Sequence, residues 1–351
     1  MIGDTPNDSH PPKRTKRRTI FISLFAIAAF SSCRLRGAFT RGNFDFLLET
    51  GNKRYPFWGA FPNVETVERL LNFTDLSDLV QLHNLPVPRN LNILFMGDSL
   101  SRYQYLDLVY FLSHNGTWPS PDETPNMVLE NTHKHGWVQF FNFTNAALRP
   151  YEQCDCFRLH SAIKAVENRY FYDAERNNSV TYLQKFGMYP FKSSWNVTDV
   201  YNEHELVQLP SGLSFVHKDL DWADAIRDFV CRMSPKPSVF IFNAGIWADH
   251  DLVNVEMQQR IVDALQECQI VSMYKTTTKM TDQRNQTWDE YEQQLCKLTD
   301  HCMDLRWTAI VPEEHYWDTK HFREPIYSMM NVQLLSLLTS SNLIETYETI
   351  S

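Results

Sequence analysis

The chain has 351 residues, of which 43% are apolar, and carries a formal net charge of −9. This length and composition suffice for one large hydrophobic core with appendages. The acidic balance argues against nucleic acid as a partner, because phosphate binding needs a basic face.

The amino terminus joins a basic leader, residues 1–18, to an apolar run, residues 19–33. A signal peptide would be cleaved after a small residue near Ser31 or Ser32, whereas an uncleaved anchor would keep its basic side in the cytosol. The run is shorter than the roughly 20 residues that span a bilayer. The long basic leader nevertheless favours an anchor over a signal peptide or a buried helix. We therefore expect a single-pass type II protein of the Golgi or secretory-pathway membrane, with the rest of the chain in the lumen.

Two further features agree with a lumenal location. Sequons of the form Asn-x-Ser/Thr begin at Asn72, Asn115, Asn142, Asn177, Asn196 and Asn285. The cysteines beyond the apolar run are Cys154, Cys156, Cys231, Cys268, Cys296 and Cys302. Their even number favours disulfides in an oxidising compartment, although the sequence does not choose among the possible pairings. Cys154 and Cys156 are too close together for the usual pair of zinc ligands.

Residues 34–88 are rich in turn-forming residues, and we expect them to form a stem or an amino-terminal lobe. Residues 89–351 form the main domain, in which strand and helix patterns alternate. We expect strands at residues 92–97, 137–143, 179–186, 238–245, 269–278 and 304–311. We expect helices at residues 101–114, 219–233, 253–268, 287–300 and 324–341. This alternation predicts an α/β fold, a three-layer α/β/α sandwich around a doubly wound parallel sheet.

Ligands bind at the carboxyl ends of the strands in sheets of this kind. Three separate stretches are predicted to meet at that edge. They are Gly97 to Ser99 after the first strand, residues 243–245 after a later strand, and residues 311–322 after the last strand. We therefore expect the functional site at this edge of the sheet.

Ser99 stands between the first strand and the first helix. A tight turn there would place its hydroxyl at a helix amino terminus, where free N–H groups and the helix dipole favour a developing negative charge. A serine nucleophile also needs a base and an orienting acid. Asp318 and His321 are three residues apart, so the carboxylate can reach the imidazole and fix its tautomer. The alternatives are that Ser99 is only a helix cap, or that His315, Asp318 and His321 bind a metal. We expect no metal, because no further ligand cluster accompanies them.

Two further side chains are candidates for binding. Asn243 ends an apolar strand, and its amide could donate to an oxyanion or could serve only as a turn residue. Arg102 lies about one turn after Ser99 and could bind an anionic group of a substrate. A solvated helix arginine is the alternative.

These blocks resemble the SGNH/GDSL superfamily, and within it the PC-esterase branch. That branch includes the trichome-birefringence-like polysaccharide O-acetyltransferases and the sialic-acid and capsule O-acetyltransferase domains. The resemblance rests on GDSLSRYQ at residues 97–104, FNAGIW at residues 242–247 and DTKHF at residues 318–322. The stretch YKTTTK at residues 274–279 is similar as well. The resemblance covers about residues 90–338 and implies an SGNH-hydrolase-like fold.

The resemblance implies that Ser99 is the nucleophile, His321 the base and Asp318 the orienting acid. It implies an oxyanion hole formed by the N–H of Ser99, by Asn243 and by a glycine, for which Gly187 is the candidate. No cofactor is implied.

We therefore expect an enzyme, a membrane-anchored lumenal serine O-acyltransferase. It would move an acetyl group from an acyl donor, through an acyl-serine, to a hydroxyl of a glycan or polysaccharide acceptor. The alternatives are an acetylesterase, in which water takes the acyl group, and a non-catalytic glycan-binding protein with the same fold. The block NAGIW at residues 243–247 is nearer to the acetyltransferases and favours transfer. Trp195, Trp247 and Trp317 could stack on sugar rings or could pack in the core.

Overall fold

The computed structural model describes residues 85–119, 137–148, 152–158, 165–185, 220–247, 251–281 and 290–345. All of them belong to one unit of the chain, Tyr55–Ser351. The basic leader, the expected anchor and nearly all of the expected stem lie outside these residues. Within the described residues, no helix combines the length and apolar character needed to cross a membrane.

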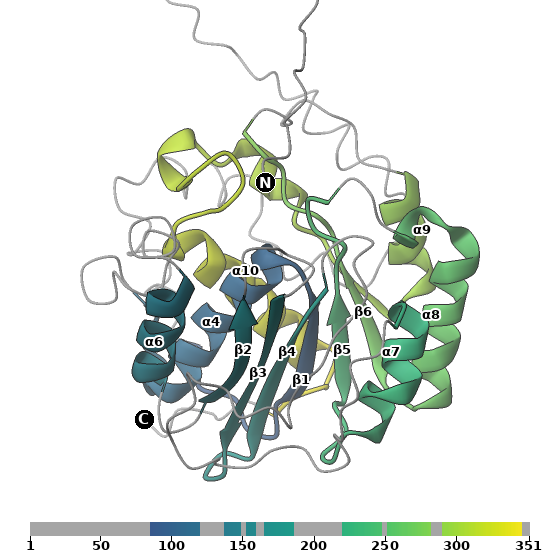
Figure 1. The fold of residues 1–351 in the computed structure, drawn as a ribbon, viewed down its shortest axis with the longest axis horizontal. Coiled ribbons are helices and arrows are strands. Elements are labelled where there is room, and N and C mark those ends of the chain that lie inside the picture. Colours follow the sequence, from purple (N-terminus) through teal and green to yellow (C-terminus); the bar gives the residue numbers. More distant parts are fainter. Residues whose placement is uncertain are drawn as a thin grey trace, which may run out of the picture. The chain divides into compact units, whose positions relative to one another are not determined.

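The described strands form one seven-stranded sheet with the order β2-β3-β4-β1-β5-β6-β7 (Figure 1). The strands are β1 Asn92–Gly97, β2 Glu152–Arg158, β3 Ala165–Asp173, β4 Asn178–Gln184, β5 Val239–Phe242, β6 Val271–Lys275 and β7 His301–Met303. Strands β4, β1, β5, β6 and β7 are parallel, whereas β3 pairs antiparallel with both β2 and β4. The predicted α/β class is confirmed, but the sheet is mostly rather than wholly parallel.

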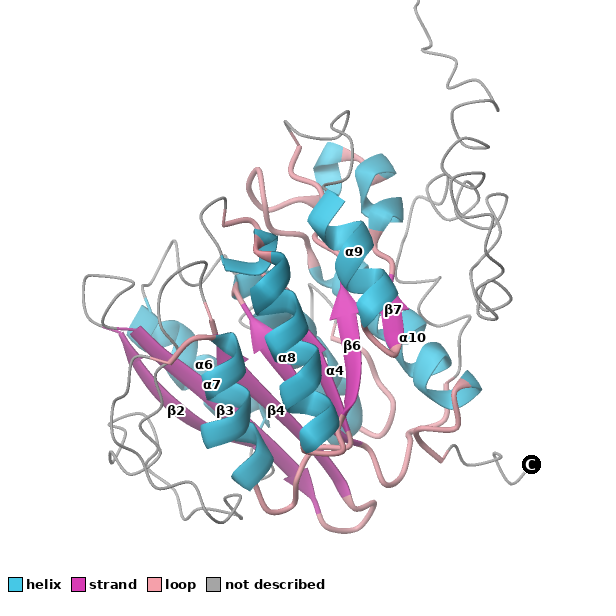
Figure 2. Cartoon of the chain, turned by 90° about the vertical axis from the view of Figure 1, so that its right-hand side faces the viewer, coloured by secondary structure: helices cyan, strands magenta, loops and turns pink. Residues whose placement is uncertain are grey.

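Helices cover both faces of the sheet (Figure 2). They are α4 Ser99–Ser113, α6 Trp137–Leu148, α7 Trp222–Asp228, α8 Val255–Glu267, α9 Glu290–Leu298 and α10 Glu324–Ser340. The buried side chains of α4, α6 and α10 share one hydrophobic cluster with the sheet, and those of α7, α8 and α9 share another. The described elements therefore form three layers.

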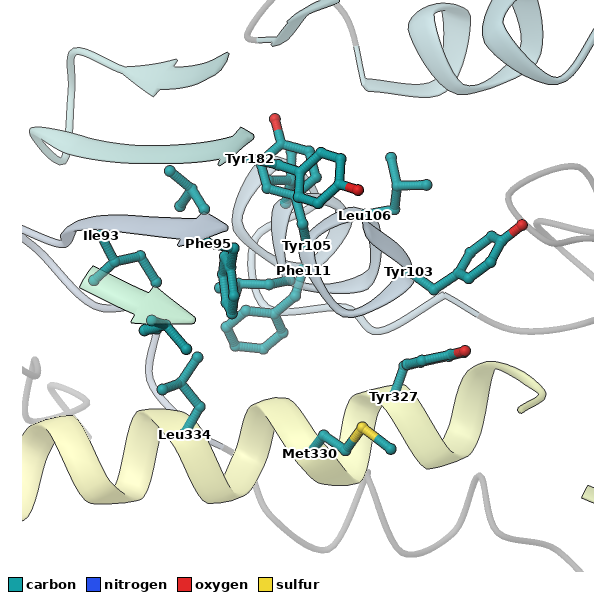
Figure 3. Close-up of a cluster of buried hydrophobic side chains, with 14 of the residues drawn as sticks. Ile93, Phe95, Tyr103, Tyr105, Leu106, Phe111, Tyr182, Tyr327, Met330 and Leu334 are labelled. Atoms are coloured by element: carbon teal, nitrogen blue, oxygen red, sulfur yellow. The ribbon is translucent and has the colours of Figure 1, made fainter. Parts of the chain in front are cut away.

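Strand β1 lies in the middle of the sheet, and both of its faces are covered. Ile93 and Phe95 pack into the cluster beneath α4 and α10, where Leu334 also lies (Figure 3). Leu94 and Met96 pack into the cluster on the opposite face. Burial on two faces explains why the sequence of β1 is a continuous apolar run. Each such side chain stabilises the fold by about 1.5–3 kcal/mol.

Two of the predicted strands are helical instead. Residues 137–143 lie in α6, where buried side chains recur at helical spacing: Phe140, Phe141, Thr144 and Leu148. Residues 304–311 contain the 3₁₀ helix Arg306–Ile310, where every third side chain is buried: Leu305, Thr308 and Val311. The last strand of the sheet is instead β7, which directly precedes this segment.

Two disulfides connect the helices of one layer and the edge of the sheet. Cys231, just after α7, pairs with Cys268 at the end of α8. Cys296 of α9 pairs with Cys302 of β7. The expectation of disulfides is confirmed, and these bonds are consistent with a secreted or lumenal protein. The side chains of Cys154 and Cys156 lie outside the described part of the structure.

Candidate active site

Strand β1 runs into α4 through a single residue, Asp98. The Asp98 carboxylate caps α4 by accepting a hydrogen bond from the backbone N–H of Leu100 at 3.0 Å. A Cβ atom at Gly97 would lie 2.5 Å from Ser101 Oγ and 2.9 Å from the backbone oxygen of Asn243, so glycine is required at this close approach. Ser99 therefore begins α4 at the carboxyl edge of the sheet, and its side chain is half-buried there.

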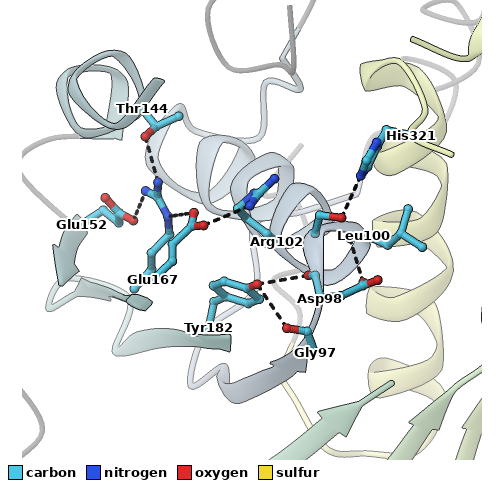
Figure 4. A network of polar contacts seen from close by, with 11 residues as sticks. Gly97, Asp98, Leu100, Arg102, Thr144, Glu152, Glu167, Tyr182 and His321 are labelled. Atoms are coloured by element: carbon cyan, nitrogen blue, oxygen red, sulfur yellow. Dashed lines mark hydrogen bonds and ion pairs between the residues drawn. The ribbon is translucent and has the colours of Figure 1, made fainter. Parts of the chain in front are cut away.

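The structure brings together the three residues predicted to form a catalytic triad. Ser99 Oγ lies 2.7 Å from His321 Nε2, although the two residues are 222 positions apart in the chain (Figure 4). His321 Nδ1 lies 2.9 Å from Asp318 Oδ2. When Nδ1 donates to the carboxylate, the lone pair of Nε2 faces the serine hydroxyl, as a general base requires.

The loop that carries Asp318 and His321 is fixed by backbone contacts. Tyr316 and Phe322 form an isolated antiparallel bridge, and the N–H of Trp317 donates to the His321 carbonyl at 2.8 Å. The backbone N–H of His321 donates to Asp318 Oδ1 at 2.8 Å. Burial raises the pKa of Asp318, but the hydrogen bonds from His321 outweigh burial and hold this pKa below its ordinary value. The carboxylate is therefore ionised whenever the imidazole needs an orienting partner.

Aromatic side chains pack around the imidazole. The rings of Tyr103 and His321 are edge-to-face with centroids 5.6 Å apart, and Tyr103 also packs on Tyr327 at 5.7 Å. Such contacts restrict the plane of the imidazole ring. The His321 side chain is 14% exposed and the Asp318 side chain 34% exposed, so the site remains partly open to solvent.

Asp98 is fully buried and joins β1, α4 and the turn after β5. Its carboxylate accepts a second hydrogen bond from the N–H of Ile246 at 3.1 Å. Gly245 has a φ of +71°, and a Cβ atom there would lie 1.8 Å from Asp98 Oδ2, so this turn requires glycine. Burial raises the pKa of Asp98 above its ordinary value, while the backbone donors and Lys275 oppose that rise.

Asn243 does not offer its amide to an oxyanion in this structure. Its Nδ2 donates to the Lys275 carbonyl at 2.7 Å and to Thr277 Oγ1 at 3.0 Å, and the side chain is fully buried. Both N–H groups of the amide therefore have acceptors, one at the last residue of β6 and one two residues beyond it. This contradicts the predicted donor role, because the amide ties β5 to β6 instead. Gly187, the candidate oxyanion glycine, lies outside the described residues.

Arg102 is also placed differently from the prediction. Its side chain is 1% exposed and forms an ion pair with Glu167 of β3 at 3.0 Å (Figure 4). Glu167 in turn pairs with Arg169 at 3.1 Å, and Arg169 pairs with Glu152 of β2 at 2.9 Å. Neither a solvated arginine nor a substrate contact describes this residue. We correct its role to that of a buried cation that joins α4 to the antiparallel edge of the sheet.

The tryptophans named from the sequence lie in different settings. Trp247 is half-buried and directly follows Ile246, whose N–H contacts Asp98. Trp317 is half-buried, and the Arg323 guanidinium lies 4.1 Å from its ring centroid. Trp195 lies outside the described residues.

The structure adds two polar side chains beneath Ser99 that the site prediction did not include. The Tyr182 hydroxyl lies 3.2 Å from the Gly97 carbonyl and 3.1 Å from the Asp98 carbonyl, which supports the turn between β1 and α4. Lys275 is buried at the end of β6, beside α4. A lysine that ends an apolar strand is an unusual pattern and could have marked this position. Tyr182 carries no such signal, since a tyrosine is ordinary in a strand.

Among the described residues, no group of three His, Cys, Asp or Glu side chains is placed to hold a metal ion. The contacts of His321 are those of a base, with the serine hydroxyl on one ring nitrogen and a carboxylate on the other. Comparisons of the chain with protein-family models, with curated proteins and with solved structures find no match.

Proposed function

We propose that the chain is a serine O-acyltransferase that acetylates a hydroxyl of a glycan or polysaccharide. The observation that carries this proposal is the line of contacts from Ser99 Oγ to His321 Nε2 and from His321 Nδ1 to Asp318. The SGNH/GDSL resemblance of the sequence blocks around these residues supports the same chemistry. The order of strands, with Ser99 one residue after the central strand β1, supports an SGNH-hydrolase-like fold.

In the first half-reaction, His321 Nε2 takes the hydroxyl proton of Ser99 while Oγ attacks the carbonyl carbon of the acyl donor. The negative charge on the carbonyl oxygen is stabilised by the backbone N–H of Ser99, which lies at the amino terminus of α4 and has no acceptor within the helix. The donor's leaving group then departs with the proton from His321. The acetyl group remains on Ser99 as an ester.

In the second half-reaction, a sugar hydroxyl attacks the ester carbonyl and gives its proton to His321. The proton passes to Ser99 Oγ as the acetylated sugar leaves, so the site returns to its starting state. Water can take the place of the sugar, and the same residues would then act as an acetylesterase. The resemblance of residues 243–247 to the acetyltransferases supports transfer over hydrolysis.

We further propose that this domain works in the lumen of the secretory pathway, held there by the apolar run at residues 19–33. The two disulfides support an oxidising compartment. The sequons along the chain support the same location.

The test is Ser99→Ala in the purified protein supplied with 4-nitrophenyl acetate and with a soluble polysaccharide acceptor. We expect the wild-type protein to release nitrophenol and the variant to be slower by at least about 10³-fold. Faster release with the acceptor present, together with acetylated acceptor, identifies transfer. Unchanged turnover in the variant contradicts the nucleophile. A non-catalytic glycan-binding protein would bind the polysaccharide and release no nitrophenol in either form.

A further inference from the structure

Lys275 is the last residue of β6, and its side chain is buried, with 1% of the residue exposed. Its Nζ donates to Ser101 Oγ at 3.0 Å and to Gln104 Oε1 at 3.1 Å. Both acceptors lie in the first two turns of α4, the helix that begins with Ser99. An amino group is thus held inside the protein against the helix that carries the proposed nucleophile.

The counter-charge of Lys275 is Asp98. Each of these two groups acts electrostatically on the pKa of the other, and Asp98 also interacts with His321. The other side chains that meet this position from the neighbouring described elements are neutral: Ser101 and Gln104 of α4, Asn243 after β5 and Met303 of β7. The buried carboxylate of α9, that of Glu292, is bonded to Tyr274 and Thr277 instead.

This charge arrangement bears on the reaction at Ser99. A carboxylate fully buried next to Ser99 opposes the negative charge that develops on the serine oxygen and on the oxyanion, and the low dielectric of the interior strengthens that opposition. A buried ammonium offsets the carboxylate and leaves the favourable field of the helix amino terminus in place. The hydrogen bonds to Ser101 and Gln104 also fix the turn that aims Ser99 at His321.

We propose that Lys275 is a positioning residue of this site, which balances the charge of Asp98 and fixes the first turns of α4 so that Ser99 can be acylated. The inference rests on the proposed function. It adds a residue that does not touch the reacting atoms and acts through Asp98 and α4.

The proposal predicts a particular dependence on pH. Burial lowers the pKa of Lys275 to about 8, while the Asp98 carboxylate opposes that change. Above this pH the ammonium loses its proton and the charge of Asp98 is no longer balanced, so acylation slows. A neutral amine still donates hydrogen bonds to Ser101 and Gln104. The loss of rate therefore reports the charge of Lys275 and not its tethering of α4.

The experiment measures kcat/KM for 4-nitrophenyl acetate from about pH 6 to about pH 10 in the wild-type protein, in Lys275→Met and in Lys279→Met. Lys279 is a second buried lysine four residues further on, and its backbone contacts Thr308 rather than α4. We expect the wild-type rate to fall on the alkaline side of about pH 8. Lys275→Met should lower kcat/KM at neutral pH by roughly tenfold to hundredfold and abolish that fall. Lys279→Met should keep both the rate and the profile.

The inference is overturned if kcat/KM of Lys275→Met still falls above about pH 8. It is also overturned if kcat/KM of the wild-type protein stays constant through about pH 9. If Lys275→Met does not fold, the rate of fluorophosphonate labelling of Ser99 in the unmodified protein supplies the same profile. Labelling that does not slow above pH 8 then overturns the inference. Failure of the proposed function looks different, because Ser99 would then not be labelled at any pH.

Discussion

The imidazole of His321 takes its orientation from Asp318, both of whose carboxylate oxygens lie within hydrogen-bond distance of Nδ1, with Oδ1 at 3.1 Å. Oδ1 accepts the backbone N–H groups of Lys320 and His321, at 2.7 and 2.8 Å. Oδ2 lies 2.9 Å from His321 Nδ1. Oδ1 therefore also fixes the loop, while Oδ2 makes the shorter contact that favours the tautomer with Nε2 free to accept the proton of Ser99.

Asp318→Asn separates these two roles. The amide oxygen can keep both backbone contacts, which leaves the amide nitrogen facing His321 Nδ1. The proton of the imidazole then moves to Nε2, and the ring can no longer take the proton of Ser99. We expect the acylation rate to fall by about 10³–10⁴-fold while the thermal midpoint changes little. Stopped-flow measurement of nitrophenol release tests this, and a variant that keeps more than about a tenth of the rate contradicts the assignment.

That Ser99, Asp318 and His321 lie together could be expected from the sequence, because their blocks follow predicted strands and resemble those of the SGNH/GDSL superfamily. Ser99 comes one residue after the central strand, and Asp318 and His321 are three residues apart beyond the last predicted strand. The roles of Arg102 and Asn243 could not be predicted in the same way. Their partners come from other strands, and only the assembled sheet brings those strands alongside.

At the scale of elements, α10 begins three residues after His321 with a buried acid. Glu324 is 4% exposed, and within the described structure neither of its carboxylate oxygens has a hydrogen-bond partner in another residue. Burial raises the pKa of Glu324 to about 7 from the ordinary value of 4.5. The folded protein therefore holds this proton more tightly than the unfolded chain. The contribution of this proton to the free energy of unfolding is fully present below about pH 4.5 and is lost as the pH rises through about 7.

Glu324→Gln should remove this dependence, because the amide stays neutral at every pH. We expect the free energy of unfolding at pH 8 to rise by about 1–3 kcal/mol and to vary less between pH 5 and pH 8. Urea unfolding at several pH values measures both quantities. Glu313→Gln, at an exposed position on the preceding 3₁₀ helix, is the matched control and should keep the wild-type slope. Equal slopes in wild type and Glu324→Gln would contradict the account.

Elements with one strong period were predictable, and those with mixed patterns were not. The amphipathic stripe of α8 indicates a helix, and the apolar run of β1 indicates a buried strand. The aromatic-rich stretch at residues 137–143 suits a strand by composition, yet in α6 its buried side chains meet the core on a helical face. Strand β7 is three residues long, which is too short for any period to be seen.

At the scale of the whole domain, the two ends of the parallel strands carry different functional groups. Ser99 and His321 lie at the carboxyl ends of the parallel strands. Two exposed asparagines that begin sequons lie at the amino ends of these strands: Asn115 in the turn after α4 and Asn177 in the turn before β4. Arg176 donates to Asn115 Oδ1 at 2.8 Å, which leaves the Asn115 amide nitrogen for a sugar. A glycan at either position would stand clear of the candidate active site.

We expect both asparagines to carry N-glycans when the full chain passes through the secretory pathway. Asn115→Gln and Asn177→Gln should each remove one enzyme-sensitive mobility shift, and the double variant should remove two. Asn90→Gln is the matched control. Asn90 is exposed in the same region and its Oδ1 accepts a hydrogen bond from Asn177 Nδ2 at 2.8 Å, but Asn90 does not begin a sequon. A membrane-associated chain from secretory-pathway cells with both asparagines unmodified would contradict a lumenal location.

The central claim is that Ser99 carries the acyl group. The most direct measurement is intact-protein and peptide mass spectrometry of the wild-type protein and of Ser99→Ala after brief exposure to 4-nitrophenyl acetate and acid quenching. The account predicts one acetyl group on the wild-type peptide that contains Ser99 and none at the corresponding peptide of the variant. A wild-type protein that turns the ester over while Ser99 stays unmodified, or a variant that turns it over equally fast, would contradict it.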